Sequence, residues 1–171
     1  PFLAHWPSVV EAGTVSSQVI CTTDLLATLA DLHGADLPDD AGEDSVSFLP
    51  ALQGKTIPDN LERGIVHHSD SGLFAIRRGN WKVVFDKAGG TRRTNPKDPP
   101  VKNPADIQLF DMKHDSVEST NLQEQRPEIV NELAVLLDKF ITEGRSTPGA
   151  RQQNEPGKRW SQIDVIRNYI P

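Results

Sequence analysis

The spacing of hydrophobic residues changes near residue 64 and separates two kinds of predicted structure. Before this point the clearest pattern is helical, because leucines recur every three or four residues over 22–33. Thr22 or Thr23 is a suitable N-cap for this helix, and Gly34 is a suitable residue to end it. The leucines predicted to share one helical face are Leu25, Leu26, Leu29 and Leu32.

Two segments beside this helix lack a helical pattern. Residues 2–6 form a short apolar run that ends at Pro7, so we expect a buried strand here, stopped by a residue that cannot donate to a sheet. Residues 35–62 are rich in Asp, Pro and Gly and are predicted to be a surface excursion with few apolar anchors.

After residue 64 the hydrophobic pattern alternates with period two. This alternation predicts four short strands, at residues 64–69, 73–78, 81–86 and 107–111. Gly79-Asn80 lies between the second and third of them and is typical of a two-residue hairpin turn. The proline-rich stretch 94–104 forbids regular hydrogen bonding and is predicted to be a loop.

A longer helix is predicted from Pro127 to Glu143, with proline in its first turn. Its broad apolar stripe must be buried, and the sheet is the obvious partner. The stripe comprises Ile129, Val130, Leu133, Leu136, Leu137, Phe140 and Ile141. The predicted fold class is therefore α+β: a small four-stranded antiparallel sheet packed by one long C-terminal helix, preceded by a strand and a helix.

Composition narrows the functional classes. A net charge of −6 argues against nucleic acid as the main partner, and no apolar run reaches the ~20 residues of a membrane span. The pairs Arg77-Arg78 and Arg92-Arg93 are interpreted as solvated surface charges. Cys21 is the only cysteine, so no internal disulfide can form, and we expect it to be a small buried residue.

Several short motifs stand in an order that resembles the C-terminal third of arylsulfatase-type enzymes of the alkaline-phosphatase-like superfamily. The two most recognisable are Phe74-Ala-Ile-Arg-Arg-Gly-Asn-Trp-Lys-Val-Val84 and the run from Leu109 to Leu122. The matching segments together are residues 1–7, 23–34, 45–54, 74–84, 109–122 and 145–149. Each match is weak alone, but their common order makes chance a poor explanation.

The resemblance implies a parent enzyme that hydrolyses sulfuric esters with a formylglycine nucleophile and a calcium ion. Formylglycine arises from Cys or Ser in a C/S-x-P-S/A-R motif, and Cys21 lacks the Pro and Arg of that motif. The family's metal ligands and catalytic Lys belong upstream of Pro1. We therefore expect a non-catalytic C-terminal fragment of a sulfatase, inactive alone, that completes the fold and lines the substrate cleft.

This interpretation divides the chain into the end of the sulfatase α/β domain (1–63), an α+β subdomain (64–144) and an irregular tail (145–171). The expected partners are the missing N-terminal catalytic domain and a sulfated carbohydrate or aryl sulfate, with neither nucleic acid nor a membrane. Such enzymes are commonly periplasmic or secreted, and the sequence leaves localisation open. The alternative function is a stand-alone carbohydrate-binding or interaction module derived from a sulfatase.

His67 and His68 are the candidate substrate-binding residues, in the sequence His67-His68-Ser69-Asp70 at a predicted strand end. Because strand neighbours point to opposite faces, only one histidine can easily join any one site. In related enzymes this edge approaches the substrate pocket, which implies that one His binds a sugar hydroxyl or the sulfate. The alternatives are a locally satisfied, half-buried histidine and, with less support, a self-contained His/Asp hydrolase.

An acidic cluster of Asp111, Asp115 and Glu118 has the oxygen ligands that cations prefer. Its spacing lacks the glycine and the terminal bidentate Glu of a calcium loop. The pattern therefore favours a solvated turn, and no metal ligand is assigned to this chain.

Overall fold

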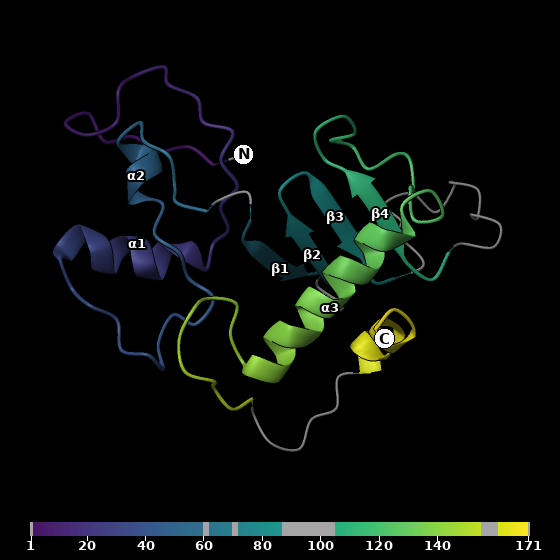
Figure 1. Ribbon diagram of the computed structural model, residues 1–171. Coiled ribbons are helices and arrows are strands. Elements are labelled where there is room, and N and C mark those ends of the chain that lie inside the picture. Colours follow the sequence, from purple (N-terminus) through teal and green to yellow (C-terminus); the bar gives the residue numbers. More distant parts are fainter. Residues whose placement is uncertain (1, 60–61, 70–71, 87–104, 155–160, 171) are drawn as a thin grey trace. The chain divides into compact units, whose positions relative to one another are not determined.

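The structure is a computed structural model that describes residues 2–59, 62–69, 72–86, 105–154 and 161–170. The chain forms two compact units (Figure 1). Unit 1 comprises residues 1–63 and 143–153, and unit 2 comprises residues 64–142 and 154–171. The whole proline-rich stretch 94–104 and the pair Arg92-Arg93 lie outside the described residues.

Unit 2 contains the predicted four-stranded antiparallel sheet. Its strands are β1 (Gly64–His68), β2 (Phe74–Arg78), β3 (Trp81–Val84) and β4 (Gln108–Asp111), in the spatial order β1-β2-β3-β4. Gly79, with φ of 55°, begins the two-residue turn between β2 and β3, so that Arg78 pairs with Trp81 and Arg77 with Lys82.

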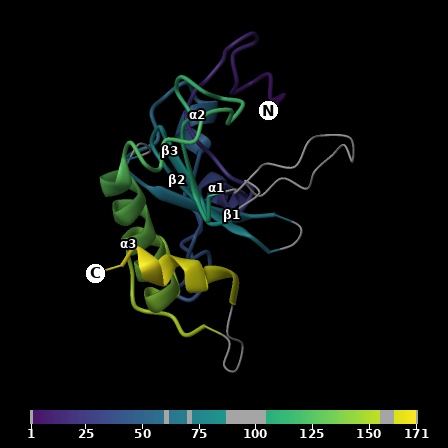
Figure 2. The same cartoon turned by 90° about the vertical axis from the view of Figure 1, so that its right-hand side faces the viewer.

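One long helix, α3 (Pro127–Glu143), covers one face of this sheet, as the apolar stripe predicts (Figure 2). The core is fully apolar and consists of Ile76, Val83, Phe85, Ile107, Leu109, Val130, Leu133, Ala134, Leu137 and Ile166. The helix approaches β1 closely, because a Cβ added to Gly64 would lie 2.7 Å from Phe140 Cε2. The α+β fold class is confirmed.

The C-terminal tail is more regular than the sequence suggests. Residues Ser161–Asn168 form a 3-10 helix, η1, where the polar composition predicts irregular structure. Burial explains the difference, since Ile166 is 2% exposed and Val165 and Tyr169 pack against the same core as α3. The part of the tail from residue 154 onward therefore belongs to unit 2, whereas residues 145–153 belong to unit 1.

Unit 1 contains the predicted first helix, α1 (Asp24–His33), and a short helix, α2 (Leu49–Leu52). Gly34 ends α1 in the left-handed conformation (φ 64°), and its N–H reaches the carbonyls of Ala30 and Asp31. At the other end Thr23 makes no side-chain capping bond. The Asp24 carboxylate instead accepts the Cys21 N–H at 2.9 Å.

The strand predicted over residues 2–6 is absent, because these described residues have no strand conformation. A strand requires a neighbour to complete its hydrogen bonds. The four strands of the described sheet pair only with one another and all lie in unit 2. The prediction of a buried strand here is wrong for the chain as it stands.

The interior of unit 1 is built partly from charged groups. Asp24 is fully buried and forms two hydrogen bonds with Arg63, from Nη1 at 2.9 Å and Nη2 at 2.7 Å. Its carboxylate also accepts the N–H groups of Cys21 and Val46. One carboxylate therefore joins three segments that are far apart in sequence.

A second charged centre attaches residues 143–153 to the excursion 35–62. Arg145 is 7% exposed and donates to the carboxylate of Asp39 at 2.9 Å. It also donates to main-chain carbonyls, which are those of Asp39, Thr147, Pro148 and Ala150. A Cβ at Gly149 would lie 2.2 Å from the guanidinium carbon, so the turn requires glycine there.

Candidate functional site

The candidate histidines lie at the end of β1, which is an edge strand of the sheet. His67 is opposite Ala75 and His68 is opposite Phe74 on β2. The strand sends the two side chains to opposite faces, and both are exposed. Neither side chain is therefore buried in the core.

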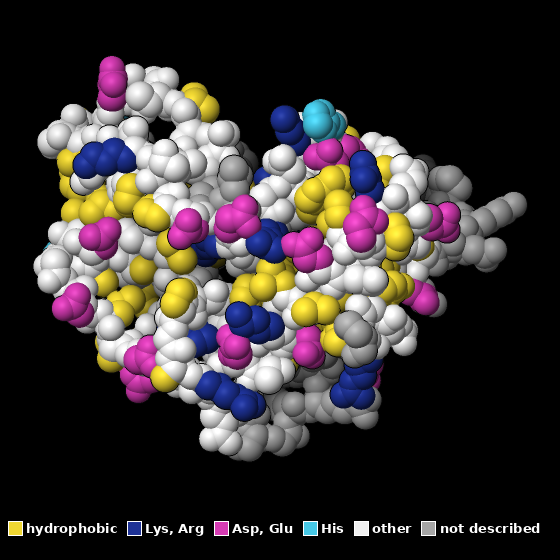
Figure 3. Space-filling model, in the orientation of Figure 1, with side chains coloured by type: hydrophobic (Ala, Val, Ile, Leu, Met, Phe, Trp, Pro, Cys, Tyr) yellow, Lys and Arg dark blue, Asp and Glu magenta, His cyan; other side chains and the backbone are white. Residues whose placement is uncertain are grey.

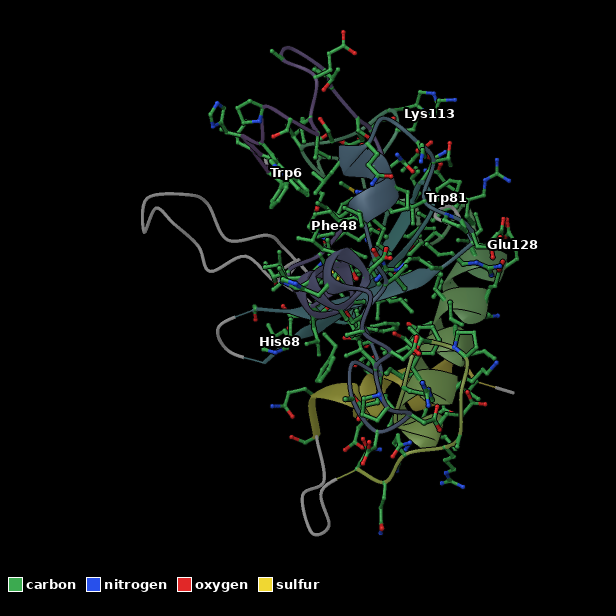
Figure 4. The ribbon with its side chains drawn as sticks, turned by 90° about the vertical axis from the view of Figure 1, so that its left-hand side faces the viewer. Trp6, Phe48, His68, Trp81, Lys113 and Glu128 are labelled. Carbon is green, nitrogen blue, oxygen red and sulfur yellow. The ribbon has the colours of Figure 1, made fainter. Side chains whose placement is uncertain are left out.

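His68 lies on the face that carries the α3-packed residues, because its strand partner Phe74 packs against that core. Figure 4 shows His68 near the end of its strand. Its ring centroid is 5.9 Å from that of Phe74, with the planes tilted by 55°. Its Nδ1 is 2.9 Å from the Ser69 carbonyl oxygen, which only accepts, so Nδ1 carries the proton. In the neutral ring Nε2 is then left as an acceptor at the edge of the sheet.

His67 lies on the opposite face, with Lys82 and Arg77 among its neighbours. Although the side chain is exposed in part, burial of the rest of it lowers the pKa of His67 below its usual 6.5. The positive charge of Lys82 lowers this pKa further. Glu118 opposes this shift without reversing it. His67 is therefore neutral at pH 7 and is suited to hydrogen bonding rather than to ion pairing.

Ser69 forms local bonds with Leu73. The Ser69 hydroxyl accepts the N–H of Leu73 at 3.2 Å, and the Ser69 N–H donates to the Leu73 carbonyl at 3.0 Å. These bonds close the turn that follows β1. Asp70 lies outside the described residues, so the His/Asp hydrolase alternative gains no support.

The acidic cluster is organised as a turn. Asp111 interacts with His114 Nδ1 at 2.7 Å, and this hydrogen bond lowers the pKa of Asp111. Asp115 accepts the N–H groups of Ser119 and Thr120, which lower its pKa as well. Glu118 pairs with Lys82. Over the described ranges, no group of three or more His, Cys, Asp or Glu side chains is arranged to hold a metal ion.

Cys21 is half-buried, not fully buried as expected, just before α1. Its Sγ lies 2.8 Å from Thr23 Oγ1 and 3.8 Å from Arg63 Nη2. The sequence Cys21-Thr-Thr-Asp-Leu25 and these neighbours do not fit a formylglycine site. Within the described part of the chain, no helix is both long and apolar enough to cross a bilayer.

Sequence reasoning missed a functional candidate in treating Arg77-Arg78 as one solvated cluster. The two side chains leave opposite faces of β2. Arg78 pairs with Glu132 on α3 at 2.6 Å, whereas Arg77 lies opposite Lys82, on the face of His67. The sequence signal for this arrangement is the two-residue turn Gly79-Asn80, because such a turn places Arg77 opposite Lys82.

No family profile matches the chain. Individual curated proteins do match. An N-acetylgalactosamine-6-O-sulfatase of Bacteroides thetaiotaomicron is 30% identical over 151 residues, which covers 83% of this chain and 27% of that protein. Arylsulfatase A of Bos taurus is 31% identical over 150 residues, which covers 77% of this chain and 27% of that protein. The chain thus spans about a quarter of the length of these relatives.

Solved structures give the same result. A structure from a study of glycosaminoglycan metabolism by Bacteroides thetaiotaomicron aligns with a TM-score of 0.51 and 30% identity, covering 68% of this chain and 24% of that one. A protein crystallised with its substrate D-glucosamine-2-N,6-O-disulfate aligns with a TM-score of 0.53 and 22% identity, covering 79% and 26%. Because the second structure is only 22% identical in sequence, its similarity to this chain concerns the fold alone.

Proposed function

We propose a function from the premise that this chain belongs to the sulfatase family and matches a C-terminal part of such an enzyme. It completes the fold of a larger sulfuric ester hydrolase and contributes a wall of its substrate cleft, without catalytic residues of its own. One observation carries this proposal: the apolar face of α1 is exposed.

The exposed face of α1 needs a partner. Leu25, Leu26, Leu29 and Leu32 are 44%, 48%, 53% and 42% exposed. Apolar side chains reach the surface over this part of the molecule in the space-filling view (Figure 3). Contiguous exposed leucines mark an interaction surface in a soluble protein, because covering them removes apolar area from water.

We assign this surface to the N-terminal catalytic part of the parent enzyme. About three quarters of the length of these relatives lies outside the part that this chain matches. That part would also supply strands beside residues 2–6, which have the apolar composition of a strand and no ladder. Phe2 and Leu3 are exposed for the same reason, at 54% and 92%.

The chemistry belongs to the same absent part. In this proposal a formylglycine nucleophile and a calcium ion lie upstream, since neither Cys21 nor the cluster Asp111, Asp115 and Glu118 fits those roles. The substrate is a sulfated carbohydrate or an aryl sulfate. His67 and His68 are the candidates of this chain for hydrogen-bonding it. Because they lie on opposite faces, one of the two is proposed to do so, through its imidazole at the end of β1.

The test uses the parent enzyme and the chain by itself. The chain alone is expected to show no turnover of an aryl sulfate above background, with or without added calcium. In the parent, Leu29→Asp should abolish soluble expression or activity, because it places a charge in the covered face. Val135→Asp on α3 is the matched control, at 43% exposure, and should leave activity within about twofold.

Two outcomes contradict the proposal. One is turnover by the purified chain that a point substitution within it removes. The other is a parent carrying Leu29→Asp that folds and turns over substrate like the wild type. The second outcome would mean that the leucine face of α1 needs no cover in the parent.

A further inference from the structure

Three nitrogen-containing side chains meet on one face of the sheet from three adjacent strands. His67 comes from β1, Arg77 from β2 and Lys82 from β3. Arg77 lies directly opposite Lys82, and the partner of His67, Ala75, is two residues before Arg77 on the same face. This is the face opposite to α3, because Ile76 and Val83 belong to the helix-packed core.

The charges of this group are not balanced. Like charges directly opposite each other on neighbouring strands repel. Glu118 pairs with Lys82 at 2.5 Å, and the side chains are 16% (Lys82) and 24% (Glu118) exposed. Arg77 has no such partner: its Nε donates to the Gly79 carbonyl at 3.0 Å, and no carboxylate in the described ranges pairs with its guanidinium.

The group is also accessible. Among the described residues no buried side-chain nitrogen or oxygen lacks a hydrogen-bond partner, so the terminal nitrogens of Arg77, which have none, reach solvent. His67 is exposed beside them. A local positive excess is thus held at the surface of a chain whose net charge is −6.

We propose that Arg77, Lys82 and His67 form a binding site for a second anionic group, a sulfate or a carboxylate, of a polyanionic saccharide. That the ligand is a saccharide rests on the proposed function, whereas the position of the site rests on the structure. A guanidinium with two free terminal nitrogens matches the paired oxygens of either group. Lys82, held by Glu118, adds positive charge, and neutral His67 adds a hydrogen bond to the anion or to a neighbouring hydroxyl.

The experiment titrates the whole 171-residue chain at low ionic strength with a uronate-containing disaccharide that carries two sulfates. Its desulfated counterpart and inorganic sulfate are titrated in parallel. Arg77→Gln is expected to weaken binding of the disulfated sugar about tenfold or more, the effect of one charged hydrogen-bonding group. Arg78→Gln is the matched control on the other face and should change binding less than about twofold.

Each other result overturns the site. Equal effects of the two substitutions would show that only overall charge matters. Inorganic sulfate binding as tightly as the disaccharide would show a general anion site without saccharide recognition. No binding by the wild-type chain would also exclude the site, since all three side chains lie in unit 2. The test of Leu29→Asp is independent, so either idea can fail while the other survives.

Discussion

The two units of this protein are stabilised by different means. In the interior of unit 2 the residues packed between sheet and helix are all apolar. In unit 1 the polar residues Asp24, Thr28 and Arg145 are buried beside a few apolar ones, while four leucines of α1 remain in water. The buried apolar residues are Phe48, Leu49 and Ile57. On α1 the buried face therefore carries the polar residues Asp24 and Thr28, while the leucines lie on the exposed face.

This difference indicates how much each unit needs a partner. Apolar burial is non-directional, and unit 2 completes its own core. Unit 1 instead depends on directional bonds around Asp24 and Arg145, which fix the positions of loops but bury little apolar area. Its leucines contribute little to stability until another surface covers them.

The largest effect is expected where a buried ion pair is broken. Asp24→Ala leaves Arg63 without its carboxylate, which costs about 3–5 kcal/mol for a buried pair. If unit 1 is less stable than that, its helix α1 unfolds. Amide hydrogen exchange in α1 gives the measurement, with exposed Asp40→Ala as the control. A change below about 0.5 kcal/mol would mean that the network is dispensable.

In unit 2 the matched experiment creates a cavity. Leu137 is 1% exposed, so Leu137→Ala should cost about 2–5 kcal/mol in chemical denaturation. Val135→Ala, on the exposed side of the same helix, should cost less than about 0.5 kcal/mol. Similar losses at both positions would show that the buried face of α3 has been wrongly assigned.

The histidines should separate substrate recognition from chemistry. In the parent enzyme, replacing the cleft-facing histidine of the pair by Ala should lower turnover of the natural sulfated substrate roughly ten- to hundredfold, for the loss of one well-aligned hydrogen bond. Turnover of a minimal aryl sulfate should fall less. If His67→Ala and His68→Ala both keep wild-type kinetics, neither histidine touches the substrate.

The smallest effects concern the dependence of stability on pH, and the two units should lose stability in different pH ranges. The pKa of His67 is lowered, so the unfolded chain binds more protons and unit 2 loses stability as pH falls below about 6.5. Burial opposes a lowered pKa at Asp24, but hydrogen bonds from Arg63, Cys21 and Val46 outweigh it. Unit 1 should therefore weaken only as pH falls below about 4.

Amide hydrogen exchange rates of each unit, measured from pH 8 to pH 3, test this order. The substitution His67→Gln should remove the loss of stability near pH 6.5. Simultaneous loss of both units, or an upper window that persists in His67→Gln, would contradict these assignments.

Local sequence patterns predicted unit 2 well because its strands, its turn at Gly79-Asn80 and its long helix are encoded by neighbouring residues. Unit 1 was harder, since Asp24 is buried by Arg63, a residue 39 positions away. The strand expected at residues 2–6 depends on neighbours that are not in the described sheet.

The candidate site shows the same limit. Its histidines are predicted from the sequence and stay a prediction, whereas the position of Arg77 opposite Lys82 required the strand register. A pair of adjacent arginines in a sequence does not reveal which of them forms an ion pair in the folded chain. Here Arg78 pairs with Glu132.

The most direct test of the account is hydrogen exchange of α1 compared between this chain and the full-length parent. If the catalytic part covers the leucine face, amides of residues 24–33 should exchange at least about tenfold more slowly in the parent, while the core amides of α3 serve as an internal reference. Equal rates for α1 in both proteins would show that its exposed leucines have no partner in the parent and would contradict the central claim.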